Sequence, residues 1–369
     1  MALLDRLRRA SGLDGFRVVG DATPPPPQPS PARGEGWGGG TTGGFIPLDR
    51  LDADPSDLDE LEAFGFRFER HPYHGVAYRG PSPRLCPDQI EWELNTRVIG
   101  RRVAVWNRVA STNDLAARAS GSLANEGLVV LAEEQSSGRG SRGRVWSAPA
   151  GSSILMSVLL FPNASMADPG WLTALGAVAV AEVVAEFGLD ARIKWPNDVR
   201  LDRRKLAGIL VERGQGTVLG IGLNVNLGPD DFPEEVRDSA TSLRQVVGRA
   251  LDRSEIARTL IRRLDEYYQQ AITHGPDWLN SSYCRFSEHY WHEVDVTTPA
   301  GVVSGRLGKL DLRMGLEVGR SHDDCRSIPT RDVLAIANRP GSRRWTHPDY
   351  HVHWWHQSPD TVFRDGTGG

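Results

Sequence analysis

The chain of 369 residues is long enough for two or three domains, and its hydrophobic content of 39% is ordinary for a soluble protein. A formal net charge of −4 gives no overall attraction to nucleic acid or to an anionic membrane surface. The cysteines Cys86, Cys284 and Cys325 are odd in number and widely spaced, so they form neither a disulfide framework nor a zinc pattern. Residues 1–20 lack the apolar core of a signal peptide and no stretch is apolar enough to span a bilayer, so we expect a cytoplasmic protein with no membrane partner.

The first 95 residues divide into two parts. Residues 1–44 hold a proline run and many glycines, which cannot bury enough apolar surface to order themselves, so we expect a disordered extension. Residues 45–95 begin with a predicted short helix over 55–63, followed by a hairpin of strands over 66–70 and 76–79. Residues 49–62 carry seven acidic residues and one basic residue, Arg50. Such a charge repels phosphate, which argues against DNA binding.

The middle of the chain, from residue 98 to 282, has an α+β pattern. An apolar helix over 169–187 is hydrophobic nearly all round, which predicts a central buried helix. Ser254 followed by Glu255 predicts a helix that begins at that serine. Strands are predicted over 103–106, 128–132, 154–160, 191–194, 207–211 and 218–225, and helices over 113–119, 169–187, 254–271 and 277–283.

The last part of the chain, over 293–336, has short predicted strands such as 293–297 and 305–308, separated by glycine-containing turns. That pattern is typical of a small β-barrel. Beyond it lies a tail whose four histidines raise the question of a metal site, although we favour incidental composition or docking onto the protein body. These residues are His347, His351, His353 and His356, with Trp354 and Trp355 among them.

A loop over residues 138–144 packs three glycines and three arginines into seven positions. Glycine lets a backbone approach a ligand closely, and arginine offers a permanent, fork-shaped donor for carboxylate and phosphate. This composition predicts a loop that closes over something anionic, whereas a solvated basic loop does not explain why the glycines alternate with the arginines. Three further blocks stand near it in the sequence: Ser-Thr-Asn over 111–113, Lys-Trp-Pro-Asn-Asp over 194–198 with Lys-Leu-Ala-Gly-Ile-Leu over 205–210, and Gly-Ile-Gly-Leu-Asn-Val-Asn over 220–226.

In this order and spacing the blocks resemble the biotin–protein ligase family. The resemblance implies an α+β fold in which a class II synthetase-like mixed sheet is flanked by helices, with a small SH3-like β-barrel at the C-terminus. It also implies that residues 45–95 are a vestigial, degenerate winged helix and linker. The expected division of the chain is an extension over 1–44, the winged-helix-like segment over 45–95, a catalytic domain over 96–285, the SH3-like domain over 286–338 and a tail over 339–369.

The resemblance implies which residues bind biotin. The block at 111–113 matches residues that hydrogen-bond the ureido end of biotin, although Ser and Thr before a helix are also ordinary helix caps. Lys205 matches the lysine that meets the biotin carboxylate and the α-phosphate, which makes it the principal catalytic candidate. The full set of implied biotin contacts is Ser111, Thr112, Asn113, Gln135, Gly138, Arg139, Gly140, Ser141, Lys205 and Gly208.

The same resemblance implies a site for ATP and the adenylate. Arg144 is the second catalytic candidate, placed near phosphate. Mg²⁺ is implied by the charge of the nucleotide, with Asp198 as a candidate contact and no metal motif in the protein itself. The implied nucleotide contacts are Arg139, Arg142, Arg144, Lys194, Asn197 and Asn224.

Ser141 departs from the family pattern, because most members carry arginine at this position. An arginine there helps to close the loop over the adenylate, so its absence predicts faster release of the intermediate. Trp146 and Trp195 fit equally well as core residues or as pocket walls.

The function implied is that of a biotin–[biotin carboxyl carrier protein] ligase. With ATP it makes biotinoyl-AMP and then acylates a lysine of the carrier protein of acetyl-CoA carboxylase or a related carboxylase. A lipoate or octanoate ligase or transferase shares this fold, but its arginine-rich, triple-glycine strand block does not occur here. A biotin-responsive transcriptional regulator would need a complete, basic helix-turn-helix. The sequence leaves the carrier and the oligomeric state open, a homodimer included.

Overall fold

The computed structural model describes residues 44–50, 55–319 and 324–342. The expected disordered extension, apart from Gly44, and the histidine-rich tail from His347 lie outside these residues. The helices are α2 (Pro55–Phe64), α3 (Pro87–Glu91), α4 (Thr112–Arg118), α5 (Pro169–Ala185), α6 (Leu243–Val247), α7 (Arg253–His274) and α8 (Asp277–Phe286). The strands are β1 (Arg67–His71), β2 (Gly75–Gly80), β3 (Arg102–Val109), β4 (Leu128–Gln135), β5 (Ser153–Leu160), β6 (Arg192–Lys194), β7 (Asp198–Leu201), β8 (Arg204–Arg213), β9 (Thr217–Asn224), β10 (Glu293–Thr298), β11 (Gly301–Asp311), β12 (Gly315–Gly319), β13 (Arg326–Ile328) and β14 (Ala335–Asn338).

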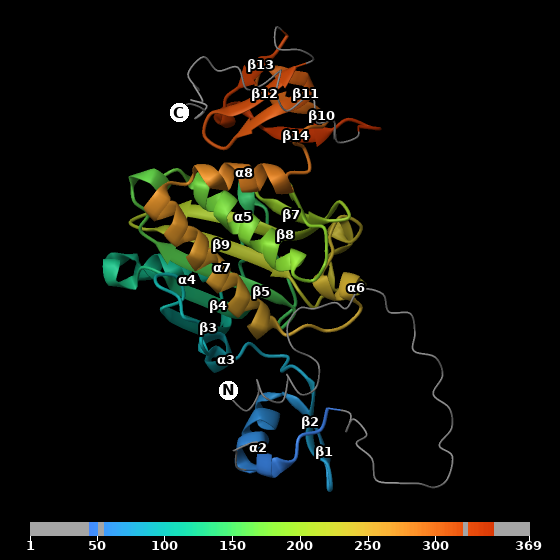
Figure 1. Ribbon diagram of the computed structural model, residues 1–369. Coiled ribbons are helices and arrows are strands. Elements are labelled where there is room, and N and C mark those ends of the chain that lie inside the picture. Colours follow the sequence, from blue (N-terminus) through green and yellow to red (C-terminus); the bar gives the residue numbers. More distant parts are fainter. Residues whose placement is uncertain (1–43, 51–54, 320–323, 343–369) are drawn as a thin grey trace, which may run out of the picture.

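A seven-stranded mixed sheet forms the centre of the molecule, in the order β3-β4-β5-β9-β8-β7-β6 (Figure 1). Strands β3 and β4 are parallel and the other neighbours are antiparallel. The predicted α+β class and the mixed sheet with flanking helices are therefore confirmed. The sequence missed β7 because its four residues include two charged side chains and do not form an apolar run.

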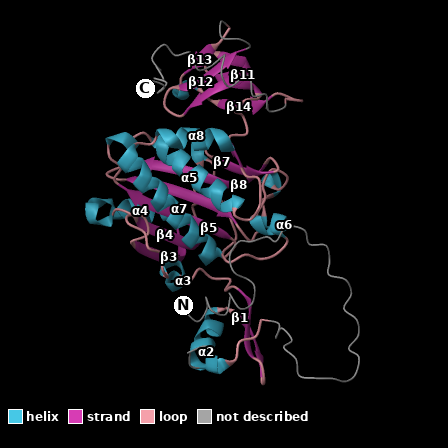
Figure 2. Cartoon of the chain, in the orientation of Figure 1, coloured by secondary structure: helices cyan, strands magenta, loops and turns pink. Residues whose placement is uncertain are grey.

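Helices α5 and α7 cover one face of this sheet, as Figure 2 shows. Helix α5 is buried over most of its circumference, which confirms the predicted central helix. Gly176 lets it approach the sheet closely, because a Cβ there would lie 3.0 Å from a methyl group of Ile209 and 3.1 Å from one of Leu219. The short helix α4 packs on the opposite face, where Ala116 contacts a cluster that includes Val130 and Val218.

Helix α7 begins at Arg253 rather than at the predicted Ser254. The N-cap is Asp252, whose carboxylate accepts hydrogen bonds from the backbone N–H groups of Ser254 and Glu255. Aspartate and serine are comparable N-caps, so residue type alone did not distinguish the two positions. The Ser254 hydroxyl instead accepts a hydrogen bond from the backbone N–H of Cys86.

The N-terminal helix α2 and the hairpin β1–β2 form a small unit with its own core of Leu58, Phe66, Val76, Tyr78 and Cys86. They lie at one end of the molecule, next to α3 (Figure 1). On the acidic helix α2, Asp59 and Glu62 both pair with Arg70 of β1.

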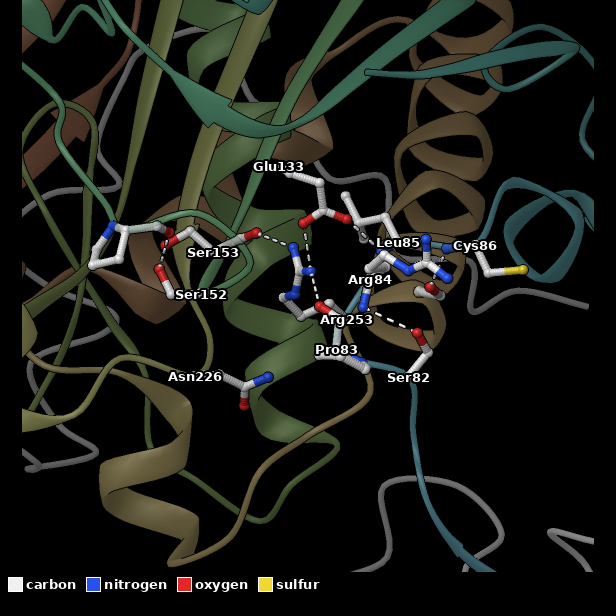
Figure 3. Close-up of polar contacts among 12 residues, drawn as sticks. Ser82, Pro83, Arg84, Leu85, Cys86, Glu133, Ser152, Ser153, Asn226 and Arg253 are labelled. Carbon is white, nitrogen blue, oxygen red and sulfur yellow. Dashed lines mark hydrogen bonds and ion pairs between the residues drawn. The ribbon is translucent and has the colours of Figure 1, made fainter. Parts of the chain in front are cut away.

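A buried ion pair between α7 and the central sheet also binds the segment that follows β2. Arg253, with a side chain 2% exposed, lies 2.6 Å from the Glu133 carboxylate of β4. Figure 3 shows that its guanidinium also donates to the backbone carbonyls of Ser153 and Pro83. The other Glu133 oxygen accepts the backbone N–H of Leu85 at 2.5 Å. Burial lowers the pKa of Arg253, and Glu133 opposes this effect.

The C-terminal strands form a five-stranded antiparallel sheet in the order β13-β12-β11-β10-β14. This sheet contacts α8. There the Asn280 amide donates a hydrogen bond to the Leu310 carbonyl and accepts one from the backbone N–H of Leu312. Its apolar side chains join the same hydrophobic core as the central sheet. Within the described part of the chain, no helix is both long enough and apolar enough to cross a membrane.

The buried ion pair yields a stability prediction. Arg253→Met should lower the free energy of unfolding by about 3–5 kcal/mol, because Glu133 would stay buried without its counter-ion. Adding Glu133→Leu should recover part of that loss. Urea denaturation followed by circular dichroism measures both changes.

The matched control is Lys309→Met. Its ion pair with Glu317 spans 3.1 Å on the C-terminal sheet, with side chains 51% and 31% exposed. Exposed pairs contribute about 0–1 kcal/mol. Equal losses for Arg253→Met and Lys309→Met would contradict the structural role of the buried pair.

Candidate functional site

A pocket lies on the face of the central sheet that is opposite to α5. Its floor lacks side chains at Gly208 of β8 and at Gly220 and Gly222 of β9, which the register places on the same face as Ser157 of β5. The walls are the start of α4, the end of β4 and the loop over residues 138–146. The lining residues are Ser111, Thr112, Asn113, Gln135, Arg139, Gly140, Ser141, Trp146, Leu155, Met156, Asn197, Lys205, Gly208, Ile209, Leu210, Gly220, Ile221 and Gly222.

The glycine floor allows two side chains to lie directly on the strands. A Cβ at Gly222 would come within 2.5 Å of the Trp146 indole, and a Cβ at Gly220 within 2.4 Å of the Asn113 amide oxygen. Trp146 is therefore a pocket wall, and with it in place the free cavity is only about 40 Å³. Pockets for small molecules usually measure about 300–1,000 Å³, so the cavity in this arrangement of the loop is small for a ligand.

A chain of hydrogen bonds crosses the pocket wall from β4 to β8. The Gln135 amide oxygen accepts the backbone N–H of Thr112 at 2.7 Å and lies 2.9 Å from its hydroxyl. The Ser157 hydroxyl lies 2.7 Å from the Thr112 hydroxyl and 2.5 Å from the Asn113 amide oxygen. Asn113 in turn donates its amide N–H to the Glu212 carboxylate at 2.7 Å.

Ser157 and Glu212 in this chain were not predicted from the sequence. Ser157 is fully buried within the apolar strand β5, and a polar residue in the middle of such a run is a signal that could have identified it. Ser111, by contrast, precedes α4 as its N-cap residue, but its side chain makes no capping hydrogen bond.

Arg139 is held by two carboxylates. Its guanidinium lies 2.7 Å from Asp114 and 2.9 Å from Glu212. The hydrogen bond from Arg139 holds the pKa of Asp114 below its ordinary value. Partial burial would raise the pKa of Glu212, but hydrogen bonds from Arg139 and Asn113 outweigh it and lower that pKa. A contact between Arg139 and phosphate stays a prediction, and it would require these pairs to open.

Lys205 lines the pocket, and the carboxylate that it pairs with lines a second, larger space. Its ammonium is 2.7 Å from the Asp198 carboxylate and 5.5 Å from the centre of a Trp146 ring. The larger space is a cleft of about 500 Å³ between the central sheet and the C-terminal sheet. Its polar lining includes Ser141, Arg142, Arg144, Thr173, Lys194, Asn197, Asp198 and Thr330.

The arginines of the loop face this cleft in different ways. Arg142, with a left-handed φ of 58°, donates to the Leu334 carbonyl beside β14 and so ties the loop to the C-terminal part of the chain. Arg144 donates to the Ser141 hydroxyl at 3.0 Å, which gives this serine a role within the loop. Trp195 also lines the cleft while its ring packs edge-on against Tyr283.

Most of the predicted site residues come together in these two spaces, and two do not line them. Gly138 lies beneath the loop, where a Cβ would collide with the Trp146 carbonyl at 2.3 Å. Asn224 is buried at the end of β9, and its amide donates to the Thr241 carbonyl at 3.1 Å. Their contacts with a ligand stay predictions.

Comparison with known proteins identifies the family. The chain is 40% identical over 230 residues to the biotin--[acetyl-CoA-carboxylase] ligase of Mycobacterium tuberculosis, covering 59% of this chain and 85% of that protein. It is 34% identical over 225 residues to the bifunctional ligase/repressor BirA of Bacillus subtilis, covering 59% and 69%. The chain belongs to the biotin–protein ligase family.

Two further comparisons agree with this membership. Residues 105–228 match the Biotin/lipoate A/B protein ligase family. The biotin protein ligase from Aquifex aeolicus in complex with biotin and ATP superposes with a TM-score of 0.57 and 24% identity, covering 65% of this chain and all of that one. At this identity the likeness concerns the fold alone.

The glycine floor yields a prediction for this ligase family member. Gly220→Ala should lower the free energy of unfolding by about 1–3 kcal/mol, because the new methyl group would overlap the buried Asn113 amide. Gly121→Ala is the matched control, since a Cβ there meets nothing within 4 Å. It should change stability by no more than about 0.5 kcal/mol. Urea denaturation compares the two, and equal stabilities would show that Asn113 does not rest on the sheet.

Proposed function

We propose that the protein activates biotin with ATP to form biotinoyl-5′-AMP. It then transfers the biotinoyl group to a lysine of the biotin carboxyl carrier protein of acetyl-CoA carboxylase or a related carboxylase. The observation that carries this proposal is the position of Lys205, which lines a pocket with a glycine floor and a polar wall and pairs with Asp198 of a cleft lined by cationic side chains. Two neighbouring spaces, with a cation of one paired to a carboxylate of the other, suit an acid that must meet a nucleotide.

The first half-reaction joins the two substrates. A carboxylate oxygen of biotin attacks the α-phosphorus of ATP, the P–O bond to the β-phosphate breaks, and pyrophosphate leaves. Negative charge gathers on the α-phosphate during this step. The Lys205 ammonium would stabilise that charge once it turns from Asp198, 2.7 Å away, toward the substrates. Arg142, Arg144 and Lys194 line the cleft where the phosphates would lie.

Mg²⁺ is proposed to arrive with ATP. In the described residues no group of three acidic, histidine or cysteine side chains could hold a metal by itself. Asp198 is the carboxylate that lines the cleft, and Mg²⁺ is commonly bound by one or two carboxylates together with substrate phosphates. The ion would supply neutralisation of phosphate charge.

The second half-reaction needs a lysine amine from the carrier protein. The neutral amine attacks the biotinoyl carbonyl carbon, AMP leaves with the electrons of the acyl–oxygen bond, and the nitrogen loses one proton to solvent as the amide forms. Water would compete for the same carbon, so the loop over 138–146 and its Trp146 are proposed to shield the intermediate. Faster release of the intermediate because of Ser141 stays a prediction.

The two alternatives are less well supported. No lipoate-type strand block occurs in the sequence. A DNA-binding regulator would place a basic helix on phosphate, whereas α2 has four acidic residues and no basic one. We therefore propose no operator binding for this chain.

The remaining assignments complete the proposal. We propose the division into an extension over 1–44, a winged-helix-like segment over 45–95, a catalytic domain over 96–285, an SH3-like barrel over 286–338 and a tail over 339–369. The antiparallel order of β10 to β14 supports the barrel. A cytoplasmic location and a homodimer fit the proposed activity.

Lys205 provides the test. Lys205→Ala should reduce biotin-dependent release of pyrophosphate by about 100- to 1,000-fold, as expected for losing one donor that stabilises transition-state charge. The matched control is Lys309→Ala, which removes a lysine from an ion pair on the C-terminal sheet. Release of pyrophosphate from ATP and biotin is measured with a coupled assay, and circular dichroism checks the fold. A near-normal rate for folded Lys205→Ala protein would refute the role of Lys205. No biotin-dependent release by the wild type would refute the function.

A further inference from the structure

We propose that Arg142 is a positioning residue that fastens the loop over residues 138–146 to the C-terminal sheet of β10 to β14. The hydrogen bond from its guanidinium to the Leu334 carbonyl, called the tether below, sets how readily the loop opens above the pocket. The tether is a property of the protein alone and can be measured without a ligand. Its consequence, slower release of biotinoyl-AMP, rests on the proposed function.

The loop is a hairpin whose two halves are joined by backbone hydrogen bonds. The N–H of Gly140 donates to the Arg144 carbonyl at 2.7 Å, and the N–H of Trp146 donates to the Gly138 carbonyl at 3.0 Å. Arg142 lies at the tip of this hairpin. Because the two halves are held together, the position of the tip affects the position of Trp146, which lines the pocket.

The hairpin is held at its base and at its tip by different parts of the protein. At the base, the guanidinium of Arg139 pairs with Asp114 of α4 and Glu212 of β8. At the tip, Arg142 donates to the Leu334 carbonyl. Within the described residues, no other hydrogen bond joins this loop to the C-terminal sheet. Loss of the tether would therefore leave the tip free to swing about the base.

The Leu334 carbonyl has a defined position in the C-terminal sheet. The backbone N–H of Leu334 donates to the Thr297 carbonyl of β10 at 2.9 Å. The next residue, Ala335, begins β14, which pairs with β10. The sheet is in turn held against α8 by the two hydrogen bonds of Asn280. The tether thus joins the loop to a hydrogen-bonded sheet and not to another loop.

The backbone of the tip does not by itself call for an arginine. Arg142 and Gly143 have left-handed φ angles of 58° and 73°, which is the pattern of a type I′ turn. Gly, Asn and Asp adopt a left-handed φ readily, whereas other residues do so at a cost in free energy. An asparagine would suit this turn better than Arg142, so the arginine is explained by what its guanidinium binds.

The tether affects any ligand that lies under the loop. The loop forms one wall of the pocket and also borders the cleft, so a ligand that spans both spaces leaves more readily when the loop moves aside. A bond that stabilises the closed arrangement therefore slows release. One hydrogen bond from a charged donor to an exposed carbonyl shifts the balance between open and closed loop by about tenfold.

The first test measures the loop without a ligand. Nitroxide labels are attached to cysteines that replace Val145 of the loop and Val302 of β11, whose side chains are 79% and 62% exposed. Cys325, the cysteine that is not buried, is replaced by serine in every variant. Pulsed electron paramagnetic resonance then gives the distribution of distances between the labels. Arg142→Asn should broaden this distribution and raise the ratio of open to closed loop by about tenfold, although asparagine suits the turn better.

Two matched variants separate the tether from the loss of a positive charge. Arg144→Ala removes a guanidinium from the same loop, but the hydrogen bonds of Arg144 go to Ser141 within that loop. Its distance distribution should therefore have the wild-type width. Arg142→Lys keeps a cationic donor at the tip and should restore at least part of the narrow distribution. Thermal unfolding shows whether each variant folds.

The second test measures release of the intermediate from protein without nitroxide labels. Biotinoyl-AMP is formed from ATP, Mg²⁺ and radioactive biotin, with pyrophosphatase present so that pyrophosphate cannot reverse the reaction. Excess unlabelled biotin is then added, and the radioactivity bound to the protein is followed by rapid filtration. Arg142→Asn should release the intermediate about tenfold faster than the wild type, and Arg142→Lys should lie closer to the wild type.

Each outcome decides one point. A broader distribution with faster release for Arg142→Asn, beside the wild-type width for Arg144→Ala, supports the proposal. An unchanged width for Arg142→Asn, or equal broadening for Arg144→Ala, overturns the tether whatever the kinetics show. A broader distribution with unchanged release overturns its effect on the intermediate. A wild-type protein that forms no biotinoyl-AMP overturns the proposed function, and the distance measurement still decides the tether.

Discussion

The absence of side chains at Gly208, Gly220 and Gly222 is the constraint on which the rest of the site depends. Because the strands are bare at these positions, the Asn113 amide and the Trp146 indole lie directly on the backbone of β8 and β9. A methyl group at Gly220 or Gly222 would occupy the same space. The hydrogen-bonded wall can therefore lie against the sheet because the glycines beneath it have no side chains.

The surroundings of the pocket tie it to both ends of the described chain. On the C-terminal side, Arg142 of the loop donates to the Leu334 carbonyl, so the loop and the C-terminal sheet share one wall of the cleft. On the N-terminal side, the pair of Arg253 and Glu133 joins β4 to the segment that follows β2 (Figure 3). Glu133 stands two residues before Gln135 on β4. The contact of Arg142 therefore involves the loop that lines the pocket, and the pair of Arg253 and Glu133 involves strand β4, which lines it through Gln135.

Sequence reasoning predicted those parts of the site that are continuous in the chain. The Gly–Arg loop, the block at 111–113 and Lys205 all lie at the two spaces. The loop was predicted from its composition, whereas the block at 111–113 and Lys205 were predicted from their resemblance to the family. Most strands of the central sheet were also predicted, since their apolar runs are long.

The partners of these residues could not be predicted in the same way. The sequence predicted that Arg139 binds an anionic ligand. In the fold it pairs with Asp114, 25 residues away, and with Glu212, 73 residues away. Ser157 reaches Asn113 only because strand register sets it beside Gly220. The start of α7 was predicted one residue too late, because Asp252 and Ser254 are similar capping residues and only the backbone geometry separates them.

We propose that one protein forms an activated biotin and delivers it to a carrier lysine, and the intact mass of a carrier protein tests this most directly. The protein is incubated with ATP, Mg²⁺, biotin and a biotin carboxyl carrier domain, and the carrier is then weighed by mass spectrometry. We expect the carrier to gain the mass of one biotinoyl group, at one lysine, and only when ATP and biotin are both present. A carrier of unchanged mass, beside the same carrier fully modified by an established biotin–protein ligase, would contradict it.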